Sequence, residues 1–265
     1  DAASALRVFG SHGIGVDAIA VDHATAIGIP VVNTPEANRL SVAEHVIALM
    51  LAVAKRTLAA DAATRKGDFN FKYGNPATEI SGKALGLIGF GGIGRLVAQM
   101  ARAAFAMDVV VLSETVAPAE IQALGYRVAR SLDALLAEAD IISLHRILRT
   151  NSGHLLGARE LGLMKPTAIL VNTARGGLID EAALVAALAA GKIAGAGLDV
   201  FISESMPASH PLLALPNVVL SPHIAGSTTE ALARTAEQVV AHILDVLAGT
   251  PTCVVNPAVW ERRRR

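Results

Sequence analysis

Short apolar runs alternate along most of the chain with longer stretches whose apolar residues recur at helical spacing. The runs predict strands at 84–90, 109–112, 126–129, 141–145, 168–174, 195–201 and 218–223. Helical spacing predicts helices between them at 117–124, 132–137, 158–164 and 181–190. Short apolar strands joined by helices are typical of a parallel sheet covered on both faces. The pattern therefore predicts an α/β fold with a doubly wound parallel sheet.

The flanking segments follow a different pattern. We expect strands at 6–9 and 30–33, a short helix at 16–27 and a final helix at 227–247. A long helix at 41–57 is apolar nearly all round, which is typical of a helix buried between domains or subunits. Ser41 and Glu44 have the spacing of a capping box at its start. The polar segment 66–80 is expected to be a loop.

A glycine motif lies where the strand at 84–90 runs into an apolar-periodic helix. Its glycines are Gly89, Gly91 and Gly94. Gly89 would allow the tight turn, Gly91 the close approach of a pyrophosphate, and Gly94 the packing of helix on sheet. The free N–H groups of the helix N-terminus would bind the anion. The motif predicts a dinucleotide-binding (Rossmann) domain; an ordinary glycine-rich turn in such a sheet is the alternative.

The apolar pattern also divides the chain into domains. We expect a dinucleotide-binding domain at 41–226 and a smaller, discontinuous α/β domain formed by 1–40 and 227–265. Because the chain crosses between the two parts twice, we expect the domains to close over a ligand by a hinge.

Composition narrows the class of protein. The formal net charge is zero, which argues against a nucleic-acid partner. No apolar run has the length and purity of a membrane span. The single cysteine, Cys253, suits a reducing compartment. We therefore expect a cytoplasmic protein without a membrane partner, and we expect no metal site.

Candidate chemical groups follow three of the predicted strands. Arg175 comes after one strand, Asp199 and Glu204 after the next, and His223 ends the last. Each has a plain structural alternative: an ion pair for the arginine, loop carboxylates for the acids, and a buried structural histidine. Ligands of parallel sheets bind at the carboxyl ends of the strands, however, and all of these residues lie at that edge together with the glycine motif.

A histidine beside a carboxylate is suited to proton transfer near neutral pH. The carboxylate favours the imidazolium ion and raises the pKa of the histidine. His223 and Glu204 could therefore exchange a proton with a substrate while a nicotinamide supplies the hydride. An arginine such as Arg175 can hold a carboxylate through two parallel hydrogen bonds. Near the N-terminus, Gly13 and Gly15 allow either a loop whose N–H groups converge on a carboxylate or a simple turn.

With these residues in place, the chain resembles the D-isomer-specific 2-hydroxyacid dehydrogenases, the group that includes phosphoglycerate dehydrogenase and glyoxylate/hydroxypyruvate reductase. The resemblance runs over nearly the whole chain. Its motifs occur in order at 13–17, 33–35, 41–45, 89–94, 164–166, 171–176, 197–201 and 221–226.

The resemblance implies a role for individual residues. Arg175 would bind the substrate carboxylate and carbonyl, His223 would be the acid/base, and Glu204 its partner. The amides of Ile14 and Gly15 would hold the substrate carboxylate. The implied cofactor site is lined by Gly89, Gly91, Gly92, Ile93, Gly94, Ser113, Thr173, Ala174, Arg175, Asp199, His223 and Gly226. Within it, Gly92 and Ile93 would lie over the pyrophosphate, Thr173 and Ala174 along the cofactor, and Asp199 near the nicotinamide carboxamide.

The chain departs from the family pattern at the adenosine end. Ser113, followed by Glu114, stands where the family usually has the aspartate that binds the ribose hydroxyls. Arg146 follows His145 where the family often has an apolar residue before proline; it could support NADP or be solvated. We expect NAD, with NADP possible. The segment that family members carry before Leu6 is absent here, so we expect the smaller domain to be incomplete.

The resemblance implies an NAD(P)-dependent oxidoreductase that interconverts a small D-2-hydroxy acid and its 2-keto acid. Two alternatives stay open: an NADH-sensing protein of the corepressor type with the same fold, and oxidation of formate or phosphite. We also expect a homodimer formed through the helix at 41–57.

Overall fold

The computed structural model describes residues 5–148 and 153–264. The chain divides into two compact units. The smaller unit comprises Asp1–Ser41 and Gly226–Arg265, and the larger comprises Val42–Ala225. Each is described by itself.

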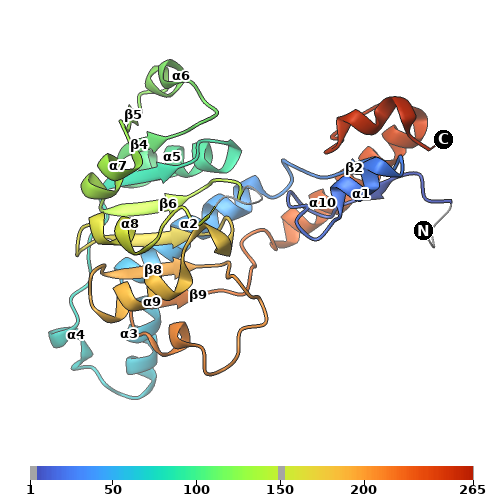
Figure 1. The fold of residues 1–265 in the computed structure, drawn as a ribbon. Coiled ribbons are helices and arrows are strands. Elements are labelled where there is room, and N and C mark those ends of the chain that lie inside the picture. The colour runs from blue at the N-terminus through green and yellow to red at the C-terminus, as the bar shows by residue number, and fades with distance from the viewer. Residues whose placement is uncertain (1–4, 149–152, 265) are drawn as a thin grey trace. The chain divides into compact units, whose positions relative to one another are not determined.

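The larger unit contains a seven-stranded sheet in the order β5-β4-β3-β6-β7-β8-β9, in which all neighbouring pairs are parallel (Figure 1). This arrangement confirms the predicted doubly wound α/β fold. Its strands are β3 (Ala84–Ile88), β4 (Asp108–Leu112), β5 (Arg127–Val128), β6 (Ile141–Leu144), β7 (Ile169–Asn172), β8 (Gly195–Leu198) and β9 (Val218–Leu220).

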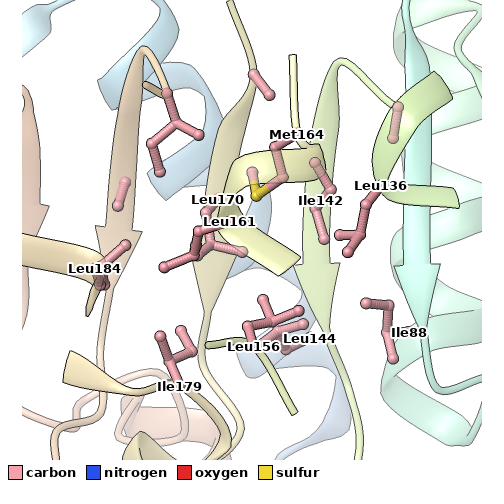
Figure 2. Packing of buried hydrophobic residues seen from close by; sticks show 14 of the residues in the cluster. Ile88, Leu136, Ile142, Leu144, Leu156, Leu161, Met164, Leu170, Ile179 and Leu184 are labelled. Carbon is pink, nitrogen blue, oxygen red and sulfur yellow. The ribbon is translucent and has the colours of Figure 1, made fainter. Parts of the chain in front are cut away.

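Helices cover both faces of this sheet because alternate strand residues point to opposite sides. On one face, strand residues such as Leu87 and Val171 pack in one cluster with α2 (Arg39–Ala54) and α5 (Gly92–Phe105). On the other face, Ile88, Ile142 and Leu170 pack with α7 (Leu132–Glu138), α8 (Ala158–Leu163) and α9 (Glu181–Ala189), as Figure 2 shows from close by. Other short helices of this unit include α6 (Pro118–Ala123), η1 (Gly176–Leu178) and η2 (Pro211–Ala214).

Small residues let α2 approach the sheet closely. A Cβ on Gly197 of β8 would lie 2.9 Å from the Cβ of Leu49 in α2. Any larger residue at this position would push the helix away from the strand. Glycine here therefore fixes the distance between α2 and the strand that leads to Asp199.

The smaller unit is built around two short parallel strands, β1 (Phe9–Gly10) and β2 (Val31–Val32). It also contains α1 (Val21–Ala26), α10 (Thr229–Ala248) and η3 (Pro257–Arg262). The buried side chain of Asn256 ties these parts together. Its oxygen accepts a hydrogen bond from the Val31 N–H (2.8 Å), and its amide donates to Thr25 Oγ1 (2.8 Å) and to the Ile29 carbonyl (3.1 Å).

Several predicted elements differ from the observed ones. The capping-box prediction is wrong: α2 begins at Arg39, and the Ser41 hydroxyl instead lies 2.8 Å from that of Thr228. Nor is α2 buried on every side, because Leu40, Glu44 and Ala48 are exposed. The helix ends earlier than predicted because Arg56 adopts a left-handed conformation (φ 53°).

The segment after Arg56 is more helical than expected. It forms α3 (Thr57–Arg65) and, inside the predicted loop at 66–80, α4 (Phe71–Gly74). The first strand begins at Phe9 rather than at residue 6, and α1 begins at Val21 rather than at residue 16. Within the part of the chain that the structure describes, no helix is both long enough and apolar enough to cross a membrane.

We expect Leu144→Ala to destabilise the larger unit by about 3 kcal/mol, because this fully buried side chain leaves a cavity when truncated. Urea denaturation followed by circular dichroism measures the change. Leu124→Ala is the matched control, since Leu124 is 44% exposed and its loss should cost less than about 1 kcal/mol. Equal losses in the two variants would contradict the assignment of Leu144 to the core.

Candidate functional site

The turn after β3 requires glycine at two positions. Gly89 has a φ of 101°, and a Cβ there would overlap the carbonyl of His145. A Cβ on Gly94 would lie 2.6 Å from the Gly89 carbonyl oxygen. Gly91 differs, because a Cβ there would meet no atom of the described chain within 4 Å. The space beside Gly91 is therefore open to a ligand.

Helix α5 presents its N-terminus to this open space. No side chain of the described residues caps the helix at Gly91. The first N–H groups of a helix have no acceptor within the helix, which here leaves those of Gly92, Ile93 and Gly94. Such groups bind phosphate anions, so the turn fits the pyrophosphate of a dinucleotide.

Three more strands end side by side at the same edge of the sheet. Asn172 of β7 is aligned with Leu198 of β8, which is aligned with Leu220 of β9. The residues that follow these strands include Arg175, Asp199 and His223, so the larger unit brings these three predicted positions to one edge. Just beyond Arg175, Gly176 is packed so tightly against the Phe201 backbone that a Cβ would not fit.

Asn172 shapes the turn that carries Arg175. Its buried side chain accepts a hydrogen bond from the Ala174 N–H (3.0 Å) and donates one to the Arg175 carbonyl (2.9 Å). The Arg175 guanidinium donates to the Ala174 carbonyl (2.6 Å). In the same turn, the buried hydroxyl of Thr173 has no hydrogen-bond partner within the described residues. Since buried polar groups are rarely left unsatisfied, this hydroxyl is a fitting contact for a bound cofactor.

Asp199 organises the turn that carries His223. Its fully buried carboxylate accepts hydrogen bonds from the Ile224 N–H (2.9 Å), the Ala225 N–H (2.9 Å) and the Ser221 hydroxyl (2.6 Å). Its main-chain carbonyl accepts one from the His223 N–H (2.8 Å). The contact with a nicotinamide carboxamide that we expect of Asp199 stays a prediction.

The pKa of Asp199 reflects two opposing effects. Burial raises it, but the hydrogen bonds from His45, Ser221 and the two backbone amides outweigh burial and lower the pKa below its ordinary value. Asp199 is therefore a carboxylate at neutral pH.

His45 and Ser221 are part of this network, and sequence reasoning did not single them out. His45 Nε2 lies 2.8 Å from the Ser221 hydroxyl and 3.5 Å from the Asp199 carboxylate. His45 belongs to α2, far from β9 in sequence, so its contact with Ser221 has no signal in local spacing. Ser221 could have been suspected, because it stands two residues before the candidate histidine.

His223 and Glu204 meet, as their assignment as a pair requires. His223 Nδ1 contacts the Glu204 carboxylate, and both side chains are solvent-exposed, at 48% and 60%. His223 adopts a left-handed backbone conformation (φ 54°). The pair borders a pocket of about 340 Å³ whose other lining residues are Phe201, Met206, Leu213, Leu220, Ser221 and Pro222. Nδ1 faces the carboxylate, which leaves Nε2 to meet a substrate.

Three of the predicted ligand residues, Ile14, Gly15 and Gly226, belong to the smaller unit. In its N-terminal loop, the carbonyls of Ile14 and Gly15 accept hydrogen bonds from the side chains of Asn33 (2.8 Å) and Ser11 (2.9 Å). Both hydrogen bonds engage carbonyl oxygens of the loop and neither uses the N–H groups of Ile14 and Gly15. These two N–H groups are therefore suited to bind an anion. Gly226, the last predicted cofactor residue, also lies in this unit, where a Cβ would crowd the side chain of Asn38.

Ser113 directly follows β4, but its oxygen is engaged locally. It accepts hydrogen bonds from the N–H groups of Thr115 (3.3 Å) and Val116 (3.1 Å). The neighbouring Glu114 forms an ion pair with Arg146 (2.6 Å). The binding of a cofactor ribose by Ser113 stays a prediction, and the carboxylate that stands beside it is that of Glu114.

Comparison with known proteins agrees with this geometry. Residues 47–225 match the family model described as "D-isomer specific 2-hydroxyacid dehydrogenase, NAD binding domain". The chain belongs to this family. The matched range includes this chain's glycine turn and also Arg175, Glu204 and His223.

Similar members of the family have named activities. The chain is 44% identical over 248 residues to D-3-phosphoglycerate dehydrogenase of Mycobacterium tuberculosis, an alignment that covers 94% of this chain and 46% of that protein. It is 40% identical over 277 residues to glyoxylate reductase of Thermofilum pendens, covering 99% and 78%. A solved acyclic imino acid reductase, Bsp5, in complex with NADPH and D-Arg, matches with a TM-score of 0.86 and 36% identity, covering 94% and 78%. The chain thus spans about half the length of the phosphoglycerate dehydrogenases that it matches.

We expect Asp199→Asn to lower the free energy of unfolding by about 2 kcal/mol at pH 7, because the amide NH₂ would face a backbone N–H. The folded-state pKa of Asp199 lies below its unfolded value. Its stabilisation is therefore complete above the unfolded pKa and is lost as the pH falls through the folded one. Urea titrations between about pH 6 and pH 2 should show a shallower acid-side loss in the variant than in the native chain.

The control is Asp61→Asn, which removes one partner of an exposed ion pair with Arg65. It should leave the stability within about 0.5 kcal/mol. An Asp199→Asn variant as stable as this control would show that the buried carboxylate does not hold the His223 turn.

Proposed function

We propose that the chain catalyses the NAD(P)-dependent interconversion of a small D-2-hydroxy acid and the corresponding 2-keto acid. The observation that carries the proposal is the contact of His223 Nδ1 with Glu204 at the sheet edge that also holds the glycine turn and Arg175. Acid/base catalysis by histidine is effective near neutral pH when a carboxylate orients the ring.

The proposed roles follow from the chemistry of each group. In the direction of reduction, His223 donates a proton from Nε2 to the keto oxygen; in oxidation it takes the hydroxyl proton. Glu204 accepts the hydrogen bond from Nδ1–H and stabilises the imidazolium ion. The Arg175 guanidinium binds the substrate carboxylate through two hydrogen bonds and polarises the keto group. A nicotinamide cofactor, held by the glycine turn and the residues after β7, would supply the hydride chemistry of the reaction.

Other residues support the proposed binding of substrate and cofactor. The amides of Ile14 and Gly15 would bind the substrate carboxylate. Gly92 and Ile93 would contact the pyrophosphate, and Thr173 and Ala174 would lie along the cofactor. Since relatives include a phosphoglycerate dehydrogenase and a glyoxylate reductase, short 2-keto acids are the substrates to test first. The proposal includes a cytoplasmic location, which the single cysteine favours.

The test of function is a panel of glyoxylate, hydroxypyruvate, pyruvate and phenylpyruvate with NADH and with NADPH, followed by loss of absorbance of the reduced nicotinamide. We expect at least one keto acid to be reduced. His223→Ala should lower kcat by about 10²- to 10⁴-fold, because the proton donor is lost. Glu204→Gln should lower kcat, because the imidazole ring loses the carboxylate that orients it.

His210→Gln is the matched control. His210 also contacts a carboxylate, that of Glu181 (3.0 Å), but it does not line the pocket beside His223, so the variant should keep its turnover. Tight nucleotide binding with no oxidation of either cofactor would favour the sensor instead of the enzyme. Oxidation of formate or phosphite in the reverse assay would point to the third alternative.

We also propose a homodimer formed through the helix at 41–57 and the helices after it. Large apolar side chains of α3, α4 and the turn between them are exposed: Leu58 at 56%, Phe69 at 70% and Tyr73 at 78%. We infer that a second copy of the chain covers these three side chains. Light scattering should give a mass near twice 27.3 kDa.

Tyr73→Glu should shift the protein towards the monomer, because association would bury the new charge. Leu124→Glu is the control, because Leu124 is exposed and belongs to the larger unit but not to α2, α3 or α4. This variant should leave the mass unchanged. A native mass equal to one chain would contradict the dimer.

A further inference from the structure

A histidine of α2 hydrogen-bonds to the strand end that leads to the turn of His223. His45 Nε2 lies 2.8 Å from the Ser221 hydroxyl and 3.5 Å from the Asp199 carboxylate. Ser221 comes directly after β9, two residues before His223. The His45 side chain is 22% exposed, whereas that of Asp199 is fully buried. Together, His45, Ser221 and Asp199 form the His45 network, which links a partly exposed ring to a buried charge.

The chemistry of the three groups sets the direction of these hydrogen bonds. Asp199 is a carboxylate at neutral pH, so it can only accept hydrogen bonds. Ser221 has one hydroxyl proton, which it donates to Asp199 over 2.6 Å. The Ser221 oxygen is then left to accept, so the donor at 2.8 Å is the N–H of His45 Nε2. His45 therefore keeps the single Ser221 proton on Asp199.

Asp199 in turn holds the backbone of the turn that carries His223. Its carboxylate accepts hydrogen bonds from the N–H groups of Ile224 and Ala225 (both 2.9 Å), and its main-chain carbonyl accepts one from the His223 N–H (2.8 Å). The His223 N–H also lies 3.1 Å from the Ser221 carbonyl. Three consecutive N–H groups thus have acceptors on one residue. The left-handed backbone of His223 (φ 54°) needs such support, because a residue other than glycine keeps this conformation only where its surroundings impose it.

The packing of α2 on β8 brings His45 within reach of this turn. Leu49 lies four residues after His45 and therefore on the same face of the helix. It packs closely on Gly197, where a Cβ would lie 2.9 Å from the Leu49 Cβ. Gly197 stands two residues before Asp199, so the contact that anchors α2 also holds His45 near the end of β8. Every residue of the His45 network belongs to the larger unit.

We propose that His45 is a positioning residue for His223, which it supports through Ser221 and Asp199. This inference rests on the proposed function, in which the His223 ring exchanges a proton with the substrate. While His45 donates to Ser221, the Asp199 carboxylate keeps its hydroxyl donor and stays in place beneath the turn. Without that donor, the Ser221 hydroxyl can rotate towards water, and the His223 ring loses support for its position next to Glu204. Because a displacement of about 1 Å is costly for a reacting group, the loss should appear in kcat.

The first test compares His45→Leu with His45→Gln in the reduction of a keto acid. His45→Leu removes the donor but keeps a good helix former, and it should lower kcat by about fivefold or more. His45→Gln offers Ser221 a side-chain N–H from a chain of similar reach, so kcat should return to within about threefold of the native value. Neither variant alters the glycine turn, so the dissociation constant of NADH, measured by calorimetry, should change by less than about threefold.

His210→Leu is the matched control. The His210 side chain is 20% exposed, close to the value for His45, and it also contacts a carboxylate, that of Glu181. Its ring contacts Glu181 and the N–H of Leu212, both outside the His45 network. This variant should therefore keep kcat within about twofold of the native value.

Two double variants separate positioning from general damage to the fold. In a His223→Ala background, His45→Leu should change the residual rate by less than about twofold, because no ring is left to position. A substitution that only damaged the fold would lower both rates alike. Ser221→Ala cuts the same link from the other side, so it should lower kcat by a similar factor, and adding His45→Leu should cost little more. Ser221→Ala also decides the matter if His45→Leu does not fold.

The proton NMR spectrum of the histidine rings gives a readout that needs no turnover. The Hε1 resonance of His223 is the one that His223→Ala removes. It should shift in His45→Leu and in Ser221→Ala, because the position of the ring relative to Glu204 changes. It should stay at its native position in His210→Leu.

The outcomes separate this inference from the proposed function. A native kcat in both His45→Leu and Ser221→Ala would overturn the inference. So would a His45→Gln variant as slow as His45→Leu, or an undiminished effect of His45→Leu in the His223→Ala background. If the folded native chain reduces no keto acid, the proposed function fails, and the NMR spectrum alone then decides whether His45 positions the ring. A His223 resonance unchanged in both single variants would show that it does not.

Discussion

The register of the parallel sheet is the constraint on which the features of the larger unit depend. Because β3 is aligned with β4 and β6, the residues that follow all three strands meet around one glycine turn. The same alignment of β7, β8 and β9 brings Arg175, Asp199 and His223 to that edge. A slip of one residue in any pair would turn these side chains to the other face of the sheet. The backbone hydrogen bonds of the sheet thus set the positions of these side chains.

A buried charge supports the turn that carries His223. The Asp199 carboxylate is fully buried and accepts three hydrogen bonds, two of them from the backbone of the His223 turn. Burial of an isolated carboxylate would be costly, but charge-assisted hydrogen bonds offset the loss of water. His223 itself stays exposed, next to Glu204. Rigid support beneath an accessible group is what a proton-transfer site needs.

Much of the fold could be predicted because its signals are local. The seven strands, the glycine turn and the residues that follow each strand come from apolar runs and glycine spacing. The start of α2 was wrong because Ser41 contacts Thr228, a residue far away in sequence, instead of capping the helix. The helices α3 and α4 were missed because they bury none of their residues and contain no apolar run like those that predicted the other elements. The contact of His45 with Ser221 could not be predicted, because it depends on how α2 packs against the sheet.

The left-handed backbone at position 223 restricts how this protein can evolve. Among residues other than glycine, only asparagine, aspartate and histidine are readily found with a positive φ, and β-branched residues are strongly disfavoured. The main chain at this position therefore favours these residues over most others. Of those few, histidine alone combines tolerance of this geometry with an ordinary pKa near neutrality. Conformation and the proposed reactivity select the same amino acid, so lineages that lose the proposed proton-transfer role should drift first to asparagine or glycine.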